Sequence, residues 1–91
     1  MQNRIVLKIY GIVQGVFFRE FVKVLADKLK IKGYVKNLPD KTVEVVAEGE
    51  DGDLRTLLKA CHEGPKRAFV EKVDVYHEEA SNEFTSFRIC F

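Results

Sequence analysis

A short glycine-containing segment, Gly11–Arg19 (GIVQGVFFR), constrains the fold of this chain more than any other stretch. It lies between strand-like alternation and helix-like spacing, so it must form the turn that joins them. Gly11 and Gly15 permit backbone conformations that a Cβ atom would forbid, and such turns let amide N–H groups converge on a bound group. A helix start adds unpaired N–H donors, and Arg19 adds a planar cation that matches two phosphate oxygens. The segment therefore predicts a cradle for a small anion, with phosphate as the expected ligand.

The size and charge of the chain limit the classes of protein to which it can belong. Its 91 residues are enough for one domain, residues 1–91, and not for two. The 15 basic and 14 acidic side chains give a formal net charge of +1, whereas nucleic-acid and membrane surfaces usually need a basic excess. The amino-terminal residues contain no long apolar run of the kind found in signal peptides and membrane spans. We therefore expect a cytoplasmic monomer with no nucleic-acid or membrane partner.

Hydrophobic spacing predicts the secondary structure of the rest of the chain. Period-two alternation predicts strands, and recurrence at i, i+3, i+4 and i+7 predicts helices. The resulting order is β-α-β-β-α-β followed by a short extra strand, which is typical of a ferredoxin-like α+β sandwich. We expect an antiparallel sheet with both helices on one face. The predicted strands are 4–10, 34–38, 42–48, one within 68–78 and 87–91, and the predicted helices are 17–30 and one that ends near residue 62. The residues expected to face the helices are Ile5, Leu7, Ile9, Val43, Val45, Val73, Val75, Phe87 and Ile89.

The predicted topology brings a second polar residue to the cradle. The first two strands run parallel because a helix crosses between them, so their carboxyl ends lie at the same sheet edge. The cradle follows the first strand, and Asn37 lies near the end of the second. With one strand between them, the separation is roughly 10 Å. A phosphate with one water molecule beside it fits such a gap.

Other phosphate-binding and metal-binding patterns are missing from the sequence. A P-loop needs Lys-Ser/Thr after its second glycine. A cysteine-phosphatase loop that ends at Arg19 would need a cysteine where Val13 stands, so we expect no phospho-enzyme. The two cysteines and two histidines complete no recognised metal-ligand spacing. Cys61 belongs to the apolar stripe of a helix and Cys90 alternates out of phase with Ile89, so we predict no disulfide between them.

Three stretches of the sequence resemble the acylphosphatase family. Gly11–Arg19 matches every fixed position of the family signature G-x-V-Q-G-V-x-F-R, and Gly33–Asn37 (GYVKN) matches the start of a second signature. The later Gly64-Pro65, Ala68 and Val70 resemble a G-P-x-x-A-x-V stretch of the family. The resemblance covers essentially the whole chain.

The resemblance implies hydrolysis of acyl phosphates by direct attack of water, with no metal and no cofactor. It implies that Arg19 binds the phosphate and that Asn37 orients the water. The implied phosphate cradle comprises Gln14, Gly15, Val16, Phe17, Phe18 and Arg19, in which Gln14 frames the loop and backbone amides bind the anion. Family members usually have glycine where this chain has Lys41, and a left-handed backbone at Lys41 would cost about 1 kcal/mol relative to glycine.

Two other classes of function are compatible with the same fold. A ferredoxin-like sheet can bind single-stranded RNA through aromatic side chains on its open face. Tyr10 and Tyr34 are candidate platforms, but the expected aromatic run is absent and the charge is balanced. A non-catalytic regulatory domain would bind a small anion in the same cradle without hydrolysing it. Nothing in the sequence marks a pocket for an acyl group.

Overall fold

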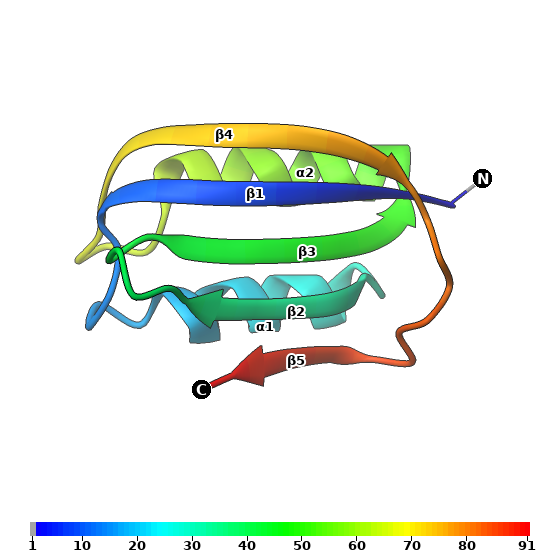
Figure 1. Cartoon of the computed structure of the whole chain (residues 1–91), viewed down its shortest axis with the longest axis horizontal. Helices are drawn as coiled ribbons and strands as arrows, with labels where there is room; N and C mark the ends of the chain where they lie inside the picture. Colours follow the sequence, from blue (N-terminus) through cyan, green and yellow to red (C-terminus); the bar gives the residue numbers. More distant parts are fainter. Residues whose placement is uncertain (1) are drawn as a thin grey trace.

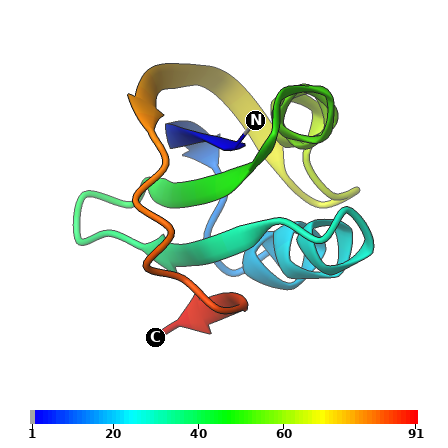
Figure 2. The ribbon, with the colours of Figure 1, turned by 90° about the vertical axis from the view of Figure 1, so that its right-hand side faces the viewer.

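Two helices cover one face of a five-stranded sheet in the computed structural model, which describes residues 2–91 (Figure 1). The end-on view shows both helices on the same side of the sheet (Figure 2). The fold confirms the predicted ferredoxin-like α+β class, and every predicted element is present. In chain order the elements are β1 (Gln2–Ile12), α1 (Phe18–Lys28), β2 (Lys32–Asn37), β3 (Val43–Glu50), α2 (Asp51–Glu63), β4 (Phe69–Glu79) and β5 (Phe87–Cys90).

The sheet is mixed, because its last strand pairs in parallel whereas the other strand pairs are antiparallel. The strand order is β4-β1-β3-β2-β5, and the pairs among β1, β2, β3 and β4 are all antiparallel. β5 instead pairs in parallel with β2, with Gly33 opposite Phe87. β1 to β4 thus form the antiparallel sheet that the sequence predicts, and the short extra strand β5 is added to it in parallel. The reason is that residues 80–86 cross one end of the sheet and carry the chain from β4 at one edge to β2 near the other (Figure 1).

The core lies between the sheet and the helices. β1 and β3 contribute fully buried side chains such as Leu7 and Val45, and the helices contribute Val22 and Leu57. All nine residues predicted to face the helices belong to this core or pack against it. Both cysteines are free, as predicted, and burial of Cys61 in the core raises the pKa of its thiol to about 12. No helix within residues 2–91 is long and apolar enough to cross a membrane.

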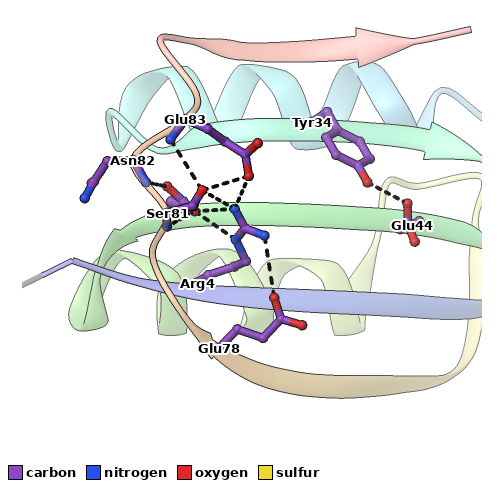
Figure 3. A network of polar contacts seen from close by, with 8 residues as sticks. Arg4, Tyr34, Glu44, Glu78, Ser81, Asn82 and Glu83 are labelled. Atoms are coloured by element: carbon purple, nitrogen blue, oxygen red, sulfur yellow. Dashed lines mark hydrogen bonds and ion pairs between the residues drawn. The ribbon is translucent and has the colours of Figure 1, made fainter.

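A buried carboxylate fixes the segment that leads to β5, and Figure 3 labels Ser81 and Asn82 of that segment near Arg4. Glu48 on β3 is only 3% exposed, and its Oε2 accepts hydrogen bonds from Arg4 Nε at 2.8 Å and Ser81 N at 2.9 Å. Its Oε1 accepts from Asn82 N at 3.1 Å. Burial raises the pKa of Glu48, but the hydrogen bonds from Ser81, Arg4 and Asn82 outweigh it and hold the pKa below its ordinary value. The crossing segment is thus attached to both β1 and β3.

The parallel strands β1 and β2 end at the same edge of the sheet, as predicted. β3 lies between them, and β1 ends at Ile12 while β2 ends at Asn37. The loop into α1 and the β2–β3 hairpin therefore both lie at this edge, on the left of Figure 1. This edge carries the candidate site.

Candidate active site

A cavity of about 210 Å³ lies at the edge where β1 and β2 end. Arg19 and Asn37 both line it, so the fold brings together the two residues that the sequence singles out. The full lining is Val13, Gly15, Phe17, Phe18, Arg19, Glu20 and Asn37. We call this space the phosphate cavity.

The two glycines of the loop have different roles. At Gly11, where β1 pairs irregularly with β4, a Cβ atom would overlap the carbonyl oxygen of Phe69. Gly11 therefore permits a close approach of two strands. At Gly15 the φ angle is +75°, and a Cβ atom would meet no atom of residues 2–91 within 4 Å. Gly15 thus presents bare backbone to the cavity.

Phe17 adopts an unusual conformation at the start of α1. It is the N-cap residue, with φ 65° and ψ 26°, and forms no side-chain hydrogen bond that caps the helix. Left-handed backbone at a bulky residue costs roughly 1–2 kcal/mol. Strained backbone conformations of this kind are common at functional sites. The first residues of α1 line the cavity, and a helix start supplies unpaired N–H donors and a positive dipole end.

Gln14 joins the loop to the β2–β3 hairpin. Its Nε2 donates hydrogen bonds to the carbonyl oxygens of Leu38 and Thr42, each at 2.9 Å. This arrangement agrees with the expected framing role of Gln14, because its side chain does not line the cavity. The side chain of Val16 likewise packs against the core. Within the six-residue cradle, Gln14 and Val16 can therefore offer the cavity only backbone groups.

Arg19 is held by the carboxyl-terminal strand. Its Nη1 donates to the carbonyl oxygen of Cys90 at 3.1 Å, and its Cζ lies 4.7 Å from the centre of the Phe91 ring. Sequence reasoning missed these partners, and it also missed Glu20 in the lining. No local pattern marks Cys90 or Phe91, since their role depends on β5 pairing beside β2.

Asn37 carries an unsatisfied acceptor. Its Oδ1 is buried and has no hydrogen-bond partner among residues 2–91. A buried polar atom without a partner costs about 1–3 kcal/mol, and such atoms commonly bind ordered water. Asn37 lines the phosphate cavity, so its amide group lies beside the space that an anion would occupy.

The turn after Asn37 keeps a regular hairpin shape although glycine is missing from it. Lys41 has a φ of 72°, so it adopts the left-handed conformation that favours glycine. Leu38 and Lys41 close the turn through a 3.1 Å hydrogen bond between Lys41 N and Leu38 O. Asp40 accepts from Thr42 N at 3.1 Å and pairs with Lys8 Nζ at 2.8 Å. The Lys8 ammonium and the hydrogen bonds from Thr42 lower the pKa of Asp40 to about 2.

The candidate aromatic platforms on the open sheet face are occupied by other contacts. Tyr34 donates its hydroxyl hydrogen to Glu44 Oε1 at 2.9 Å (Figure 3), and burial followed by this bond raises the pKa of Tyr34 to about 12. Lys72 Nζ lies 4.5 Å from the centre of the Tyr10 ring, and Lys36 Nζ lies 5.9 Å from the centre of the Tyr34 ring. These contacts give no support to base stacking, which needs free ring faces.

The fold and the cavity define a class of small α+β proteins with a candidate site at one end of the sheet, where β1 and β2 end. The acylphosphatase family model matches residues 5–89. The acylphosphatase of Marinobacter nauticus is 48% identical over 86 residues, which cover 94% of each chain. The acylphosphatase of Syntrophus aciditrophicus is 40% identical over 91 residues, which cover 100% of this chain and 95% of that protein. The crystal structure of acylphosphatase from Bacillus subtilis superposes with a TM-score of 0.94 at 34% identity, over 100% of both chains. The chain belongs to the acylphosphatase family.

Proposed function

We propose that this protein is an acylphosphatase that hydrolyses acyl phosphates in the phosphate cavity. The oxygen of a water molecule forms a bond to phosphorus as the bond from phosphorus to the acyl oxygen breaks. The carboxylate leaves with the bonding electron pair, and a phosphate oxygen takes the proton of the water. The products are a carboxylate and inorganic phosphate. Family membership and the shared cavity of Arg19 and Asn37 support this proposal.

Positive charge at the site suits the demands of phosphoryl transfer. The transition state is loose, with charge spread over the phosphoryl oxygens, so positioning and electrostatic stabilisation can supply the catalysis. Arg19 and the backbone N–H groups at the start of α1 would supply that stabilisation. The leaving carboxylic acid has a pKa near ~4, so the reaction needs no general acid. We infer that the reaction also needs no metal ion.

The place of Asn37 in the wall of the phosphate cavity, together with Arg19, is the observation that favours hydrolysis over anion binding alone. An amide oxygen can accept a hydrogen bond from water and hold it in place, although it is too weak a base to remove the proton. A site that only binds phosphate needs hydrogen-bond donors, so an amide oxygen in its wall adds nothing to binding. The regulatory-domain alternative therefore has less support.

Benzoyl phosphate hydrolysis in the presence of a chelator tests the proposal. The wild-type protein should hydrolyse it at the same rate with and without EDTA. Arg19→Ala should lower kcat/KM by at least about 10²-fold, the usual effect of losing one stabilising donor. An inactive, folded wild-type protein would contradict the proposal, and loss of activity in EDTA would contradict its metal-independent form.

We also propose that residues 1–91 act as one domain and as a cytoplasmic monomer with inorganic phosphate as a cradle ligand. The balanced charge of the sequence supports a monomer without a nucleic-acid or membrane partner. Sedimentation equilibrium at micromolar concentration should give the mass of one chain.

A further inference from the structure

A second cavity adjoins the phosphate cavity and follows α1. It has a volume of about 580 Å³, and Phe17 and Glu20 line both cavities. The two spaces are therefore neighbours that share a wall. The full lining of the second cavity is Phe17, Glu20, Phe21, Val24, Leu25, Lys28, Ala60 and Pro65.

Most of this lining is apolar, and part of it is unusually exposed. Phe17 is 64% exposed and Val24 is 55% exposed. These two residues are seven positions apart on α1 and its N-cap, so they lie on the same side of the helix. The strained backbone of Phe17 holds its ring where the two cavities meet. An aromatic side chain kept in solvent by a costly conformation points to a ligand that covers it.

We propose that this second cavity, the acyl groove, binds the acyl group of the substrate. This inference rests on the proposed function and specifies it further. The preferred substrates are acyl phosphates with aromatic or extended apolar acyl groups. The carboxylate of Glu20 at the junction disfavours acyl groups that carry a second carboxylate close to the anhydride, because like charges repel.

The arrangement of the two cavities agrees with in-line displacement. The attacking oxygen and the leaving oxygen must lie on opposite sides of phosphorus. Asn37 lines the phosphate cavity and does not line the acyl groove. Water held by Asn37 and the leaving acyl group in the groove would thus lie in different parts of the site around phosphorus.

The length of the groove is sufficient to distinguish short from long acyl groups. From Phe17 to Lys28 the helix advances roughly 16 Å at 1.5 Å per residue. Each methylene that leaves water adds up to about fourfold in affinity. Acetyl phosphate can cover only the junction at Phe17, whereas a hexanoyl chain extends along α1 towards Val24.

The test compares chain length in a binding experiment and a kinetic experiment. Dissociation constants of methylphosphonate and hexylphosphonate report on the groove without hydrolysis, and KM values of acetyl and hexanoyl phosphate report on substrates. We expect the longer member of each pair to bind at least tenfold more tightly. Val24→Asp should bring both ratios close to one. Thr56→Asp introduces the same charge at an exposed position of α2 outside both cavities and should leave both ratios unchanged.

The outcomes separate the acyl groove from the proposed function. Equal affinity for the two phosphonates would overturn the groove, even if both acyl phosphates are hydrolysed. A tenfold preference for hexylphosphonate without any hydrolysis would support the groove and contradict the enzyme. If NMR signals of Val24 and Ala60 shift with protein concentration but not with hexylphosphonate, a second copy of the chain occupies the groove and the proposal fails.

Discussion

Arg19, near the start of α1, donates a 3.1 Å hydrogen bond to the carbonyl oxygen of Cys90, the last residue of β5. The Arg19 guanidinium, which is expected to bind phosphate, is therefore positioned by the last strand of the chain. β5 in turn pairs with β2, the strand that ends at Asn37. β5 holds Arg19 and β2 carries Asn37, so two neighbouring strands set the positions of the two proposed catalytic side chains.

Phe91→Ala should weaken phosphate binding modestly. The ring of Phe91 lies over the Arg19 guanidinium, and an exposed cation–π contact contributes about 0.5–1 kcal/mol. We expect the inhibition constant of inorganic phosphate to rise about two- to fivefold. Phe84→Ala is a matched control, because Phe84 makes the same kind of contact with Arg4, 5.3 Å away and outside the phosphate cavity. Equal effects of the two variants on phosphate inhibition would contradict a specific role for Phe91.

Lys41→Gly should stabilise the fold. Lys41 has a φ of 72°, and glycine removes a conformational cost of about 1 kcal/mol. The expected rise in Tm is about 4–8 °C for a domain of this size. Lys41→Ala is the control, because it removes the side chain but keeps the strain, so its Tm should not rise. A lower Tm for Lys41→Gly than for wild type would refute the prediction.

Much of the fold could be predicted because local signals agree with one another. The alternation in β1 and β3 and the helical spacing of Val22 and Leu57 specify which faces are buried, and the βαβ rule places Asn37 beside the cradle. The direction of β5 could not be predicted. Its four residues carry no signal for a parallel neighbour, and its place depends on the buried contacts of Glu48 with residues 81 and 82.

Glu48→Gln should lower the free energy of unfolding at pH 7. It should also reduce the loss of stability that occurs as the pH falls below the unfolded pKa of the carboxyl group. The pKa of Glu48 is lower in the folded protein than its ordinary value. Its contribution is therefore complete above the unfolded pKa, about 4.3, and is lost as the pH falls through the lower folded value. Weakening these buried hydrogen bonds should cost about 1–3 kcal/mol at pH 7.

Urea unfolding between pH 3 and pH 7 measures this effect. Glu78→Gln is the control, because Glu78 lies 3.6 Å from the same Arg4 but its side chain is 51% exposed. An exposed ion pair contributes about 0–1 kcal/mol, so the control should resemble wild type. Parallel stability profiles for wild type and Glu48→Gln would show that the buried carboxylate does not titrate as described.

Gln14→Leu should lower kcat more than it weakens phosphate binding. The amide of Gln14 ties the cradle loop to Leu38 and Thr42, which flank the turn after Asn37. Both carbonyls keep a backbone donor, so the loss of stability should be only about 1 kcal/mol. Gln2→Leu, an exposed change at the far end of β1, is the control for the added apolar surface. If Gln14→Leu keeps the wild-type kcat, the link between loop and hairpin has no part in catalysis.

The candidate site could be predicted in its residue types but not in its surroundings. The spacing of Gly15, Arg19 and Asn37 predicts an anion site with a second polar group, and the structure places all three in one cavity. The strained conformation of Phe17 and the contacts of Arg19 with β5 are tertiary effects. Residues distant in sequence determine them, so no local pattern reveals them.

Asn37→Ala separates hydrolysis from binding most directly. Steady-state kinetics with benzoyl phosphate and inhibition by inorganic phosphate should be measured on wild type and on this variant. If Asn37 holds the attacking water, kcat should fall by about 10²-fold or more while the phosphate inhibition constant stays within twofold. An unchanged kcat, or a parallel loss of phosphate affinity, would contradict the role of Asn37 and the mechanism built on it.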